Sequence, residues 1–171
     1  MIRLNVLFAE TLSYWTVGTK NIYENVKLLV VKGQQMSTLI ILQGLPASGK
    51  TTKARELSQP GNNVRVNRDL LREMLHFGFS LKEEDTIRKT EELLIKAFLN
   101  KGRDVIVDDT NLKDKTIRRL FKMAAECSAE VEFIEMNVSL EECIRRDAVR
   151  DNPVGRGIIR HMYNDFQLRK E

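Results

Sequence analysis

Short apolar runs alternate with segments of helical periodicity along most of the chain. The runs TLIILQ (38–43), NVRVN (63–67), DVIVD (104–108) and VEFIEM (131–136) have the length and the β-branched content of buried strands. Between them, apolar residues recur every three or four positions. Strands that alternate with helices in this way are typical of a parallel sheet covered by helices on both faces, so the pattern predicts an α/β fold.

Two segments carry the clearest helical stripes. In residues 80–102 the predicted buried face holds Ile87, Leu94 and Phe98. In residues 113–126 it holds Ile117, Leu120, Phe121 and Ala124. Ser80 and Ser139 are each followed three residues later by a glutamate, which predicts that both serines cap helices.

The chain divides into a leader and one domain. Residues 1–35 contain one weak strand-like run, NVKLLVV, and no catalytic motif, whereas Met36 directly precedes the first strong strand. Lys32 and Gly33 require purine-rich codons that resemble a bacterial ribosome-binding site. We expect a domain over residues 36–171, with residues 1–35 either a mis-assigned start or a real extension. The intact mass of the protein made from its native locus separates these alternatives.

Composition narrows the class of protein. The 171 residues carry a net charge of +4, with 42% hydrophobic and 30% charged residues, the balance of a globular domain. Contacts with polyanions must therefore come from local groups of Arg and Lys. Cys127 and Cys143 lack metal-ligand spacing, which favours a reducing, cytoplasmic location. No apolar run approaches the roughly 20 residues that span a bilayer, so no membrane association is expected.

A glycine-rich loop follows the first predicted strand. Gly44-x-x-x-x-Gly49-Lys50-Thr51 matches the P-loop pattern at every fixed position, and the alternative is an ordinary strand-to-helix turn. In a P-loop, backbone N–H groups surround phosphate oxygens, the lysine reaches the outer phosphates and the hydroxyl binds Mg²⁺. The residues expected to bind the nucleotide here are Gly44, Ser48, Gly49, Lys50, Thr51 and Thr52.

Acidic residues follow the second and third strands. Asp69 falls in the first turn of a helix with Arg72 three positions on, so Asp69 could accept a hydroxyl proton and Arg72 could bind an acceptor phosphate. The alternative is an acid that only stabilises its helix. Asp108 and Asp109 follow a buried strand, and at least one of them is expected near Mg²⁺ and its waters. The alternative is that they only form the turn before the next helix. Thr110 or Asn111 is expected to cap the next helix.

The C-terminal segment is rich in arginine. Arg146 and Arg150 are spaced to share a helix face, and Arg156 lies beyond a Pro153–Gly155 break. Forked cations near a triphosphate can stabilise charge on a transferring phosphoryl group, whereas the alternative is a solvated basic face. His161 and His76 are expected at the surface or in packing rather than in catalysis.

Together these motifs resemble the kinase domain of the phage-type polynucleotide 5′-kinase family, related to zeta-toxin-like small P-loop kinases. The resemblance covers residues 38–166 and rests on GLPASGKTT, NRDLLR, DDTN and RRDAVRDNPVGRGIIRHMY. It implies a P-loop kinase fold with a C-terminal arginine-bearing lid. The implied activity is transfer of the γ-phosphate of ATP, with Mg²⁺, to the 5′-hydroxyl of DNA or RNA in end repair. A ligase is the implied candidate partner, and a phage-encoded enzyme would act in the host cytosol.

The resemblance also implies roles for individual residues. Lys50 and Thr51 would bind the triphosphate and Mg²⁺, with Asp108 as an added acid at the metal. Asp69 would be the general base, Arg72 would bind the acceptor phosphate, and Asp109 would hold the acceptor side in place. Arg146 and Arg150 would form the phosphate-sensing lid, with Arg150 acting in catalysis.

Two other readings remain open from the sequence. One is a small-molecule kinase of the same fold that acts on a nucleoside or a sugar nucleotide. The other is a non-catalytic nucleotide-binding module that docks on a ligase or repair complex. A P-loop lysine, a candidate base and lid arginines in one chain argue against the module, because binding alone needs no base.

Overall fold

Strands and helices alternate through the chain, as the hydrophobic pattern predicts. The computed structural model describes residues 2–5, 37–59, 61, 63–75 and 80–167, and the predicted strand-like run at 25–31, Met36 and His76 lie outside these ranges. The strands are β1 (Ile2–Asn5), β2 (Thr38–Gln43), β3 (Val64–Val66), β4 (Val105–Val107) and β5 (Glu130–Glu135). The helices are α1 (Lys50–Ser58), α2 (Arg68–Met74), α3 (Glu84–Leu99), α4 (Asp114–Glu126), α5 (Leu140–Asp147) and α6 (Arg156–Gln167). All four predicted strands form, within one residue of their predicted ends.

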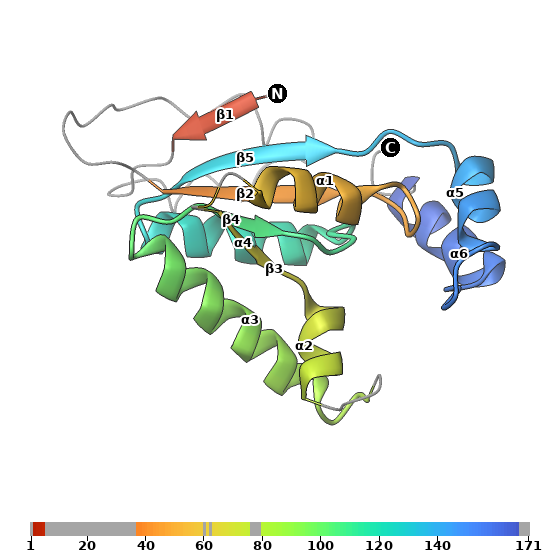
Figure 1. Cartoon of the computed structure of the whole chain (residues 1–171), viewed down its shortest axis with the longest axis horizontal. Helices are drawn as coiled ribbons and strands as arrows, with labels where there is room; N and C mark the ends of the chain where they lie inside the picture. The colour runs from red at the N-terminus through yellow and green to blue at the C-terminus, as the bar shows by residue number, and fades with distance from the viewer. Residues whose placement is uncertain (1, 6–36, 60, 62, 76–79, 168–171) are drawn as a thin grey trace.

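The strands form one sheet in the order β1-β5-β2-β4-β3 (Figure 1). Strands β5, β2, β4 and β3 are mutually parallel, which confirms the predicted α/β fold with a parallel sheet. Strand β1 adds an antiparallel edge to β5, an element that the sequence did not predict. The P-loop strand β2 lies between β4 and β5. After β2, the chain forms β3 and β4 on one side of it and then crosses to form β5 on the other side. Ligands bind at such a reversal, beyond the carboxyl ends of the strands.

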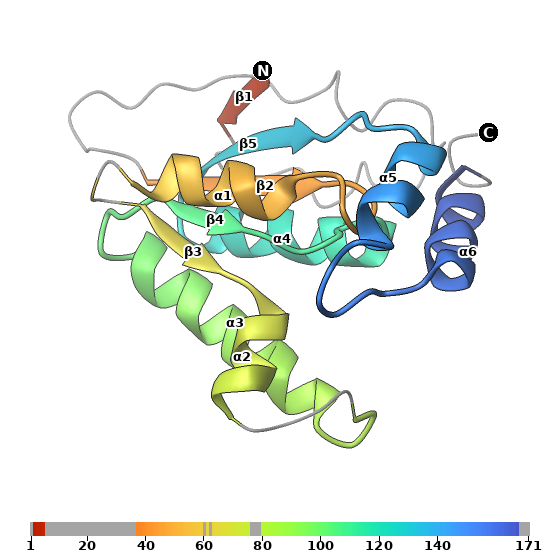
Figure 2. The same cartoon turned by 45° about the vertical axis from the view of Figure 1, so that its right-hand side comes forward.

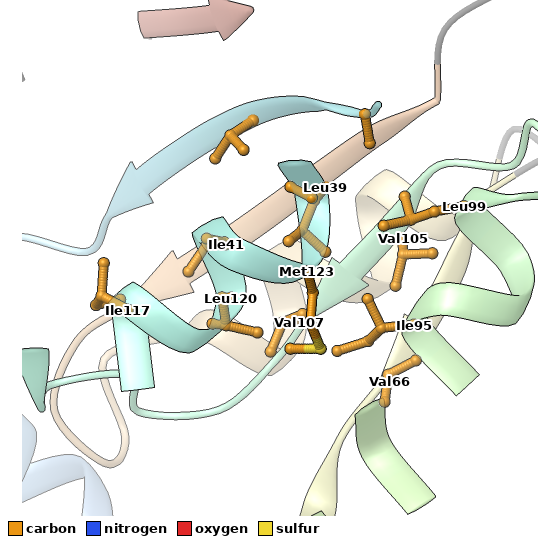
Figure 3. Close-up of a cluster of buried hydrophobic side chains, with 13 residues drawn as sticks. Leu39, Ile41, Val66, Ile95, Leu99, Val105, Val107, Ile117, Leu120 and Met123 are labelled. Carbon is orange, nitrogen blue, oxygen red and sulfur yellow. The ribbon is translucent and has the colours of Figure 1, made fainter. Parts of the chain in front are cut away.

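Alternate residues of β2 face two separate hydrophobic layers, as expected of a strand buried on both faces. Leu39 and Ile41 point into the larger layer, where α3 and α4 cover the sheet (Figure 3). Ile40 and Leu42 pack on the other face against Ala54 of α1. The predicted helices on both faces are therefore confirmed, and the sheet edge that carries the P-loop rests on a rigid core.

Helices α5 and α6 form a third packed unit beside the carboxyl end of β2 (Figure 2). Cys143 of α5 and Ile159 of α6 are fully buried, together with Leu45 of the P-loop and Leu112 of the loop after β4. This cluster joins the C-terminal helices to the two loops at the sheet edge. The predicted arginine-bearing segment is therefore anchored next to the P-loop.

Helix ends and faces differ from the sequence prediction in three places. Ser139 caps α5 as predicted, accepting a bond from the Glu142 N–H at 3.3 Å. The predicted cap at Ser80 is wrong, because α3 begins only after Glu83 and Ser80 contributes its carbonyl to a preceding turn. The buried stripe of α3 is shifted by one position after Ile87: Ile95 and Leu99 are buried, whereas the predicted Leu94 and Phe98 are only partly buried. In α4, the predicted Ile117, Leu120 and Ala124 are buried, which confirms this part of the stripe. Only Phe121 differs, because it is partly buried while Met123 is buried.

Among the residues that the structure describes, no helix is long and apolar enough to cross a bilayer.

Candidate active site

The predicted site residues gather at the carboxyl edge of the sheet. Gly44 follows β2, Asn67 follows β3, and Asp108 and Asp109 follow β4. Two hydrogen bonds close this edge: Gly44 N–H donates to Thr110 O at 3.0 Å, and Asp108 N–H donates to Val66 O at 3.0 Å. The loops after three neighbouring parallel strands therefore form one continuous surface.

The P-loop has the backbone of an anion-binding turn. Gly49, at φ 96°, is the N-cap of α1, and Ala47 also has a positive φ of 61°. Left-handed residues beside right-handed ones turn successive N–H groups toward a common point, which is how backbone cradles bind phosphate. A Cβ on Gly44 would lie 2.8 Å from Ser48 Oγ and 3.0 Å from Met136 Cβ, so no larger residue fits there. The loop thus fits a phosphate chain at the start of α1.

Lys50 is folded over the loop that precedes it. Its ammonium donates to Gly44 O at 2.9 Å, to Leu45 O, and to Ser48 Oγ at 3.3 Å. The side chain is buried, with only 7% of the residue exposed. The prediction placed Lys50 toward a ligand. The structure shows that its charge is held within the loop, close to where phosphate would lie.

Burial dominates the electrostatics of Lys50. Loss of hydration lowers the pKa of Lys50 to about 8, against the opposing effect of Asp108, Cys143 and Asp109. Arg150, from the segment after α5, lowers the pKa further. The ammonium is therefore protonated below pH 8 and has less positive charge above it, in the absence of bound phosphate.

Binding of ATP should consequently depend on pH in a defined direction. Phosphate oxygens beside Lys50 favour the charged ammonium, so we expect proton uptake on binding between pH 8 and 9, where the free protein is partly deprotonated. The kcat/KM for ATP should fall above pH 8, while kcat should fall only at higher pH. Titration calorimetry in buffers of different ionisation enthalpy measures the uptake. Lys50→Arg, which stays charged, should remove it.

Thr51 and Asp108 lie together, as predicted for a magnesium site. Burial raises the pKa of Asp108, against the opposing effects of Arg65, of the Thr51 side chain and of Lys50. Arg65 of β3 holds Asp108 Oδ2 through Nε at 2.8 Å and Nη2 at 2.6 Å. Asp108 Oδ1 is buried without a hydrogen-bond partner of normal geometry among the described residues. A hydroxyl beside a carboxylate oxygen that has no hydrogen-bond partner in the described part of the chain fits a Mg²⁺ site, because Mg²⁺ binds oxygen ligands.

Asn111 braces the sheet edge instead of capping a helix. It is buried with φ 47°, and its amide donates to Leu42 O at 2.8 Å, while Gln43 Nε2 donates to Asn111 O at 2.8 Å. The N-cap of α4 is Lys113, which makes no side-chain cap. The predicted cap at Thr110 or Asn111 is therefore wrong. Asn111 ties the end of β2 to the loop that carries Asp108 and Asp109.

Helix α2 presents Asp69 and Arg72 in its first two turns. The side chain of Asn67 caps α2 by accepting the Leu70 N–H at 2.9 Å, and its amide also donates to Asp108 O. Arg72 Nη1 donates to Asp69, which is 85% exposed. Arg72 Nη2 donates to both oxygens of Glu84, at 2.7 and 2.9 Å. The predicted i, i+3 pair forms, and a third residue, Glu84, joins it.

Asp109 is bound by a residue that the sequence analysis missed. The Arg68 N–H lies 3.4 Å from Asp109 Oδ1, and Arg68 Nε donates to Oδ2 at 3.1 Å. Arg68 Nε also lies 3.7 Å from Oε1 of the buried Glu91, whose other oxygen accepts from Arg119. Burial, followed by the nearby Asp109, raises the pKa of Glu91. This ion network fixes the start of α2 to the end of β4 and to the two helices below.

The two lid arginines have partners within their own segment. Arg146 Nε lies 2.6 Å from Oε1 of Glu142 on the same helix, α5. Arg150 Nη1 lies 3.3 Å from Asp147 Oδ1, and the Arg150 side chain is 48% exposed. Arg150 is one of the groups that lower the pKa of Lys50, after burial, and it lines a surface hollow together with Arg55 of α1.

Asp147 organises the loop between α5 and α6. It is buried and accepts the Val154 N–H at 3.1 Å and the Gly155 N–H at 2.8 Å. Burial opposes its charge, but these N–H groups and Arg150 together lower the pKa of Asp147 below its usual range. The sequence could not predict these hydrogen bonds, because they depend on the conformation of the loop between α5 and α6.

Replacing Asp147 with alanine should therefore loosen the lid. Two backbone N–H groups lose their acceptor, which should lower the free energy of unfolding by about 1–3 kcal/mol. Asp151→Ala, in the exposed part of the same loop, is the matched control and should have little effect. Urea unfolding measures the difference, and limited proteolysis locates it. Equal stability of the two variants would show that Asp147 does not hold the loop.

Comparisons with known proteins match most of this chain. A family model described as "AAA domain" matches residues 39–168. An L-seryl-tRNA(Sec) kinase from Methanococcus maripaludis is 32% identical over 133 residues, which are 75% of this chain and 52% of that protein. A protein of Autographa californica nuclear polyhedrosis virus, named as a bifunctional polynucleotide kinase/RNA ligase, is 28% identical over 167 residues, 88% of this chain and 24% of that protein. The chain thus spans about half and a quarter of these relatives' lengths.

Solved structures extend the likeness. In the structure of the Pnkp1/Rnl/Hen1 RNA repair complex, one chain superposes with a TM-score of 0.72 at 29% identity, covering 81% of this chain and 47% of that one. A gluconokinase from Sinorhizobium meliloti 1021 shares the fold, with a TM-score of 0.52 at 14% identity, covering 77% of this chain and 75% of that one. With its P-loop at the carboxyl end of a parallel sheet, and with the family model matching residues 39–168, the protein belongs to this AAA domain family.

Proposed function

We propose that the protein transfers the γ-phosphate of ATP to the 5′-hydroxyl of a polynucleotide, in nucleic-acid end repair. The observation that carries the proposal is the placement of Asp69 and Arg72 on α2. Helix α2 starts at the same sheet edge as the P-loop, and Asn67 and Arg68 both bind the loop after β4. An exposed carboxylate and an arginine thus lie on the helix that follows β3, at the same end of the sheet as the phosphate cradle, and an acceptor with a hydroxyl and a phosphate could dock there.

The donor side uses the P-loop. Its backbone N–H groups, with Ser48, Gly49 and Thr52, bind the phosphates of ATP, and the ammonium of Lys50 moves from the loop carbonyls to the outer phosphates. Thr51 and Asp108 would hold Mg²⁺, and Arg65 keeps the Asp108 carboxylate in place. When bound, Mg²⁺ neutralises part of the phosphate charge.

The acceptor side uses α2. Arg72 leaves Glu84 and Asp69 to bind the phosphate on the 3′ side of the nucleoside, which frees Asp69 to accept the proton of the attacking 5′-hydroxyl. Both oxygens of Asp109 already bind Arg68, so we infer that Asp109 acts by positioning α2. It is a positioning residue in this proposal and does not touch the acceptor.

The lid completes the charge balance. Arg150 places a half-exposed guanidinium in reach of Lys50, so it can bind the transferring phosphoryl group as charge develops. Arg146 would bind the same phosphates only after it leaves Glu142, 2.6 Å away. Arg150 lies 3.3 Å from Asp147, so it needs less rearrangement. The Pro153–Gly155 turn, held by Asp147, sets where Arg150 lies.

The relatives support this acceptor and also favour a second one. The viral relative is named for polynucleotide kinase and RNA ligase activity, and the structural relative belongs to an RNA repair complex with Rnl and Hen1. These names suggest a ligase as partner. The second candidate is phosphorylation of a seryl group on tRNA, which the 32% identity to a seryl-tRNA kinase favours. Both candidates present a hydroxyl on a nucleic acid, whereas a free nucleoside or sugar does not.

A panel of acceptors tests the proposal. ADP release should be measured with ATP, Mg²⁺ and one of four acceptors: a 5′-hydroxyl oligonucleotide, seryl-tRNA, a nucleoside, or gluconate. We expect the oligonucleotide to give the highest kcat/KM. The highest value with seryl-tRNA would select the second candidate. The highest value with a free nucleoside or gluconate would contradict both.

A further inference from the structure

Helix α4 carries a row of basic side chains that the proposed site does not use. Lys115, Arg118 and Lys122 are spaced by three and four residues, so they form one line along the helix. All three are exposed, because the opposite side of α4 is buried against the sheet. We call these three residues the α4 basic row.

The charges of the row are largely uncompensated. Neither Lys115 nor Arg118 makes an ion pair with any residue in the described ranges, and Lys122 only approaches Glu126 at 3.7 Å. On the neighbouring helix α3, by contrast, Arg88 binds Asp85 and Lys96 binds Glu92 and Glu126. The α4 basic row is therefore a strip of positive potential on a helix beside one whose charges are balanced.

One end of the row lies at the end of the sheet from which α2 also starts. Helix α4 follows the loop with Asp109, and its first turns lie at the same sheet edge. Arg119 of α4 contacts Glu91, which in turn lies against Arg68 at the start of α2. Lys115 lies one helical turn before Arg119 on the same side of α4, and so nearer to the carboxyl end of the sheet. Figures 1 and 2 show α4 running from this edge beneath the sheet next to α3. The row thus leads away from α2.

We propose that the α4 basic row binds the phosphate backbone of a polynucleotide acceptor beyond its first nucleotide. The inference rests on the proposed function and deepens it, because it explains how the enzyme would prefer a polymer to a single nucleotide. Arg72 contacts only the first phosphate. A chain continuing past it meets cations at regular intervals, and phosphates are the anions that such a row complements. Base identity plays no part in these contacts.

The test compares a long acceptor with a short one. The variant Lys115→Gln/Arg118→Gln/Lys122→Gln should phosphorylate a 5′-hydroxyl oligonucleotide with kcat/KM roughly tenfold or more below the parent at low salt. A nucleoside 3′-monophosphate, which reaches only Arg72 and Asp69, should react as with the parent. The dependence of log kcat/KM on log salt for the oligonucleotide should be less steep by about 2, since each single-strand phosphate contact contributes about 0.7.

A matched control separates position from total charge. Lys101→Gln/Arg145→Gln/Arg160→Gln removes three exposed cations from other elements, and it should leave both acceptors unaffected. Equal losses with both acceptors, or the same loss in the control, would overturn the path along α4 while leaving the proposed function standing. If the parent phosphorylates neither acceptor, the proposed function itself fails and the path fails with it. Because all the replaced residues are exposed, both variants should unfold at the parent temperature.

Discussion

Lys50→Ala should lower the rate of phosphoryl transfer by roughly 10²–10³-fold or more, the effect of removing one donor to transition-state charge. The ammonium is the buried cation of the P-loop, and its three loop acceptors hold it within reach of bound phosphate. A steady-state assay with saturating acceptor measures the loss. Lys53→Ala is the matched control, because it removes a partly exposed lysine from the same helix, whose one ion pair within the described residues is with Glu56.

The fold should survive this replacement. Lys50→Ala loses the bonds to the loop but also removes a charge that burial disfavours, as the pKa near 8 shows. We expect the unfolding temperature to move by less than about 4 °C, which corresponds to roughly 1 kcal/mol for a protein of this size. Activity comparable to that of the parent would remove the P-loop lysine from the mechanism.

Asp69→Asn should lower turnover by roughly 10²–10⁴-fold, the usual contribution of a positioned base. The amide has nearly the same shape but cannot accept the hydroxyl proton. The lower end of that range is expected, because phosphoryl transfer through a loose transition state requires little proton removal. Initial rates on a 5′-hydroxyl oligonucleotide and unfolding curves should come from one preparation.

If Asp69 only stabilises its helix, the Asp69→Asn variant should keep the turnover of the parent. With its side chain 85% exposed, Asp69 contributes little burial energy, so Asp69→Asn should cost well under about 1 kcal/mol of stability in either case. Asp85→Asn, an exposed acid in the first turn of α3, is the control and should leave turnover unchanged. A stable Asp69→Asn protein with parent turnover would assign this residue to helix stabilisation alone.

The parallel sheet could be predicted because its strands are continuous apolar runs between amphipathic helices. Strand β1 could not, since four residues far from the rest of the domain carry no periodic signal. The predicted helix cap at Ser80 was wrong because local spacing alone does not fix where a helix begins. The spacing of Ser80 and Glu83 fits a capping box, but the chain makes a separate turn there before α3 begins.

The ion pairs around Asp109 could not be predicted from the sequence, because they join residues that are far apart along the chain. Arg68 meets Asp109 across 41 positions and Arg119 meets Glu91 across 28, so local patterns cannot pair them. One signal was available: Glu91 lies four residues from both Ile87 and Ile95, on the buried stripe of α3. An acid at a core position of a helix indicates a buried partner, since an unpaired charge there is costly.

The position of the transferred phosphate tests the central claim most directly. The protein is incubated with Mg²⁺, γ-labelled ATP and an oligonucleotide that has a 5′-hydroxyl and a blocked 3′ end, and the product is digested to 5′-mononucleotides. We expect all of the label in the 5′-terminal nucleotide, and none when Lys50→Ala replaces the parent. Label at any other position, or no transfer to the oligonucleotide while seryl-tRNA or a small molecule is phosphorylated, would contradict a polynucleotide 5′-kinase.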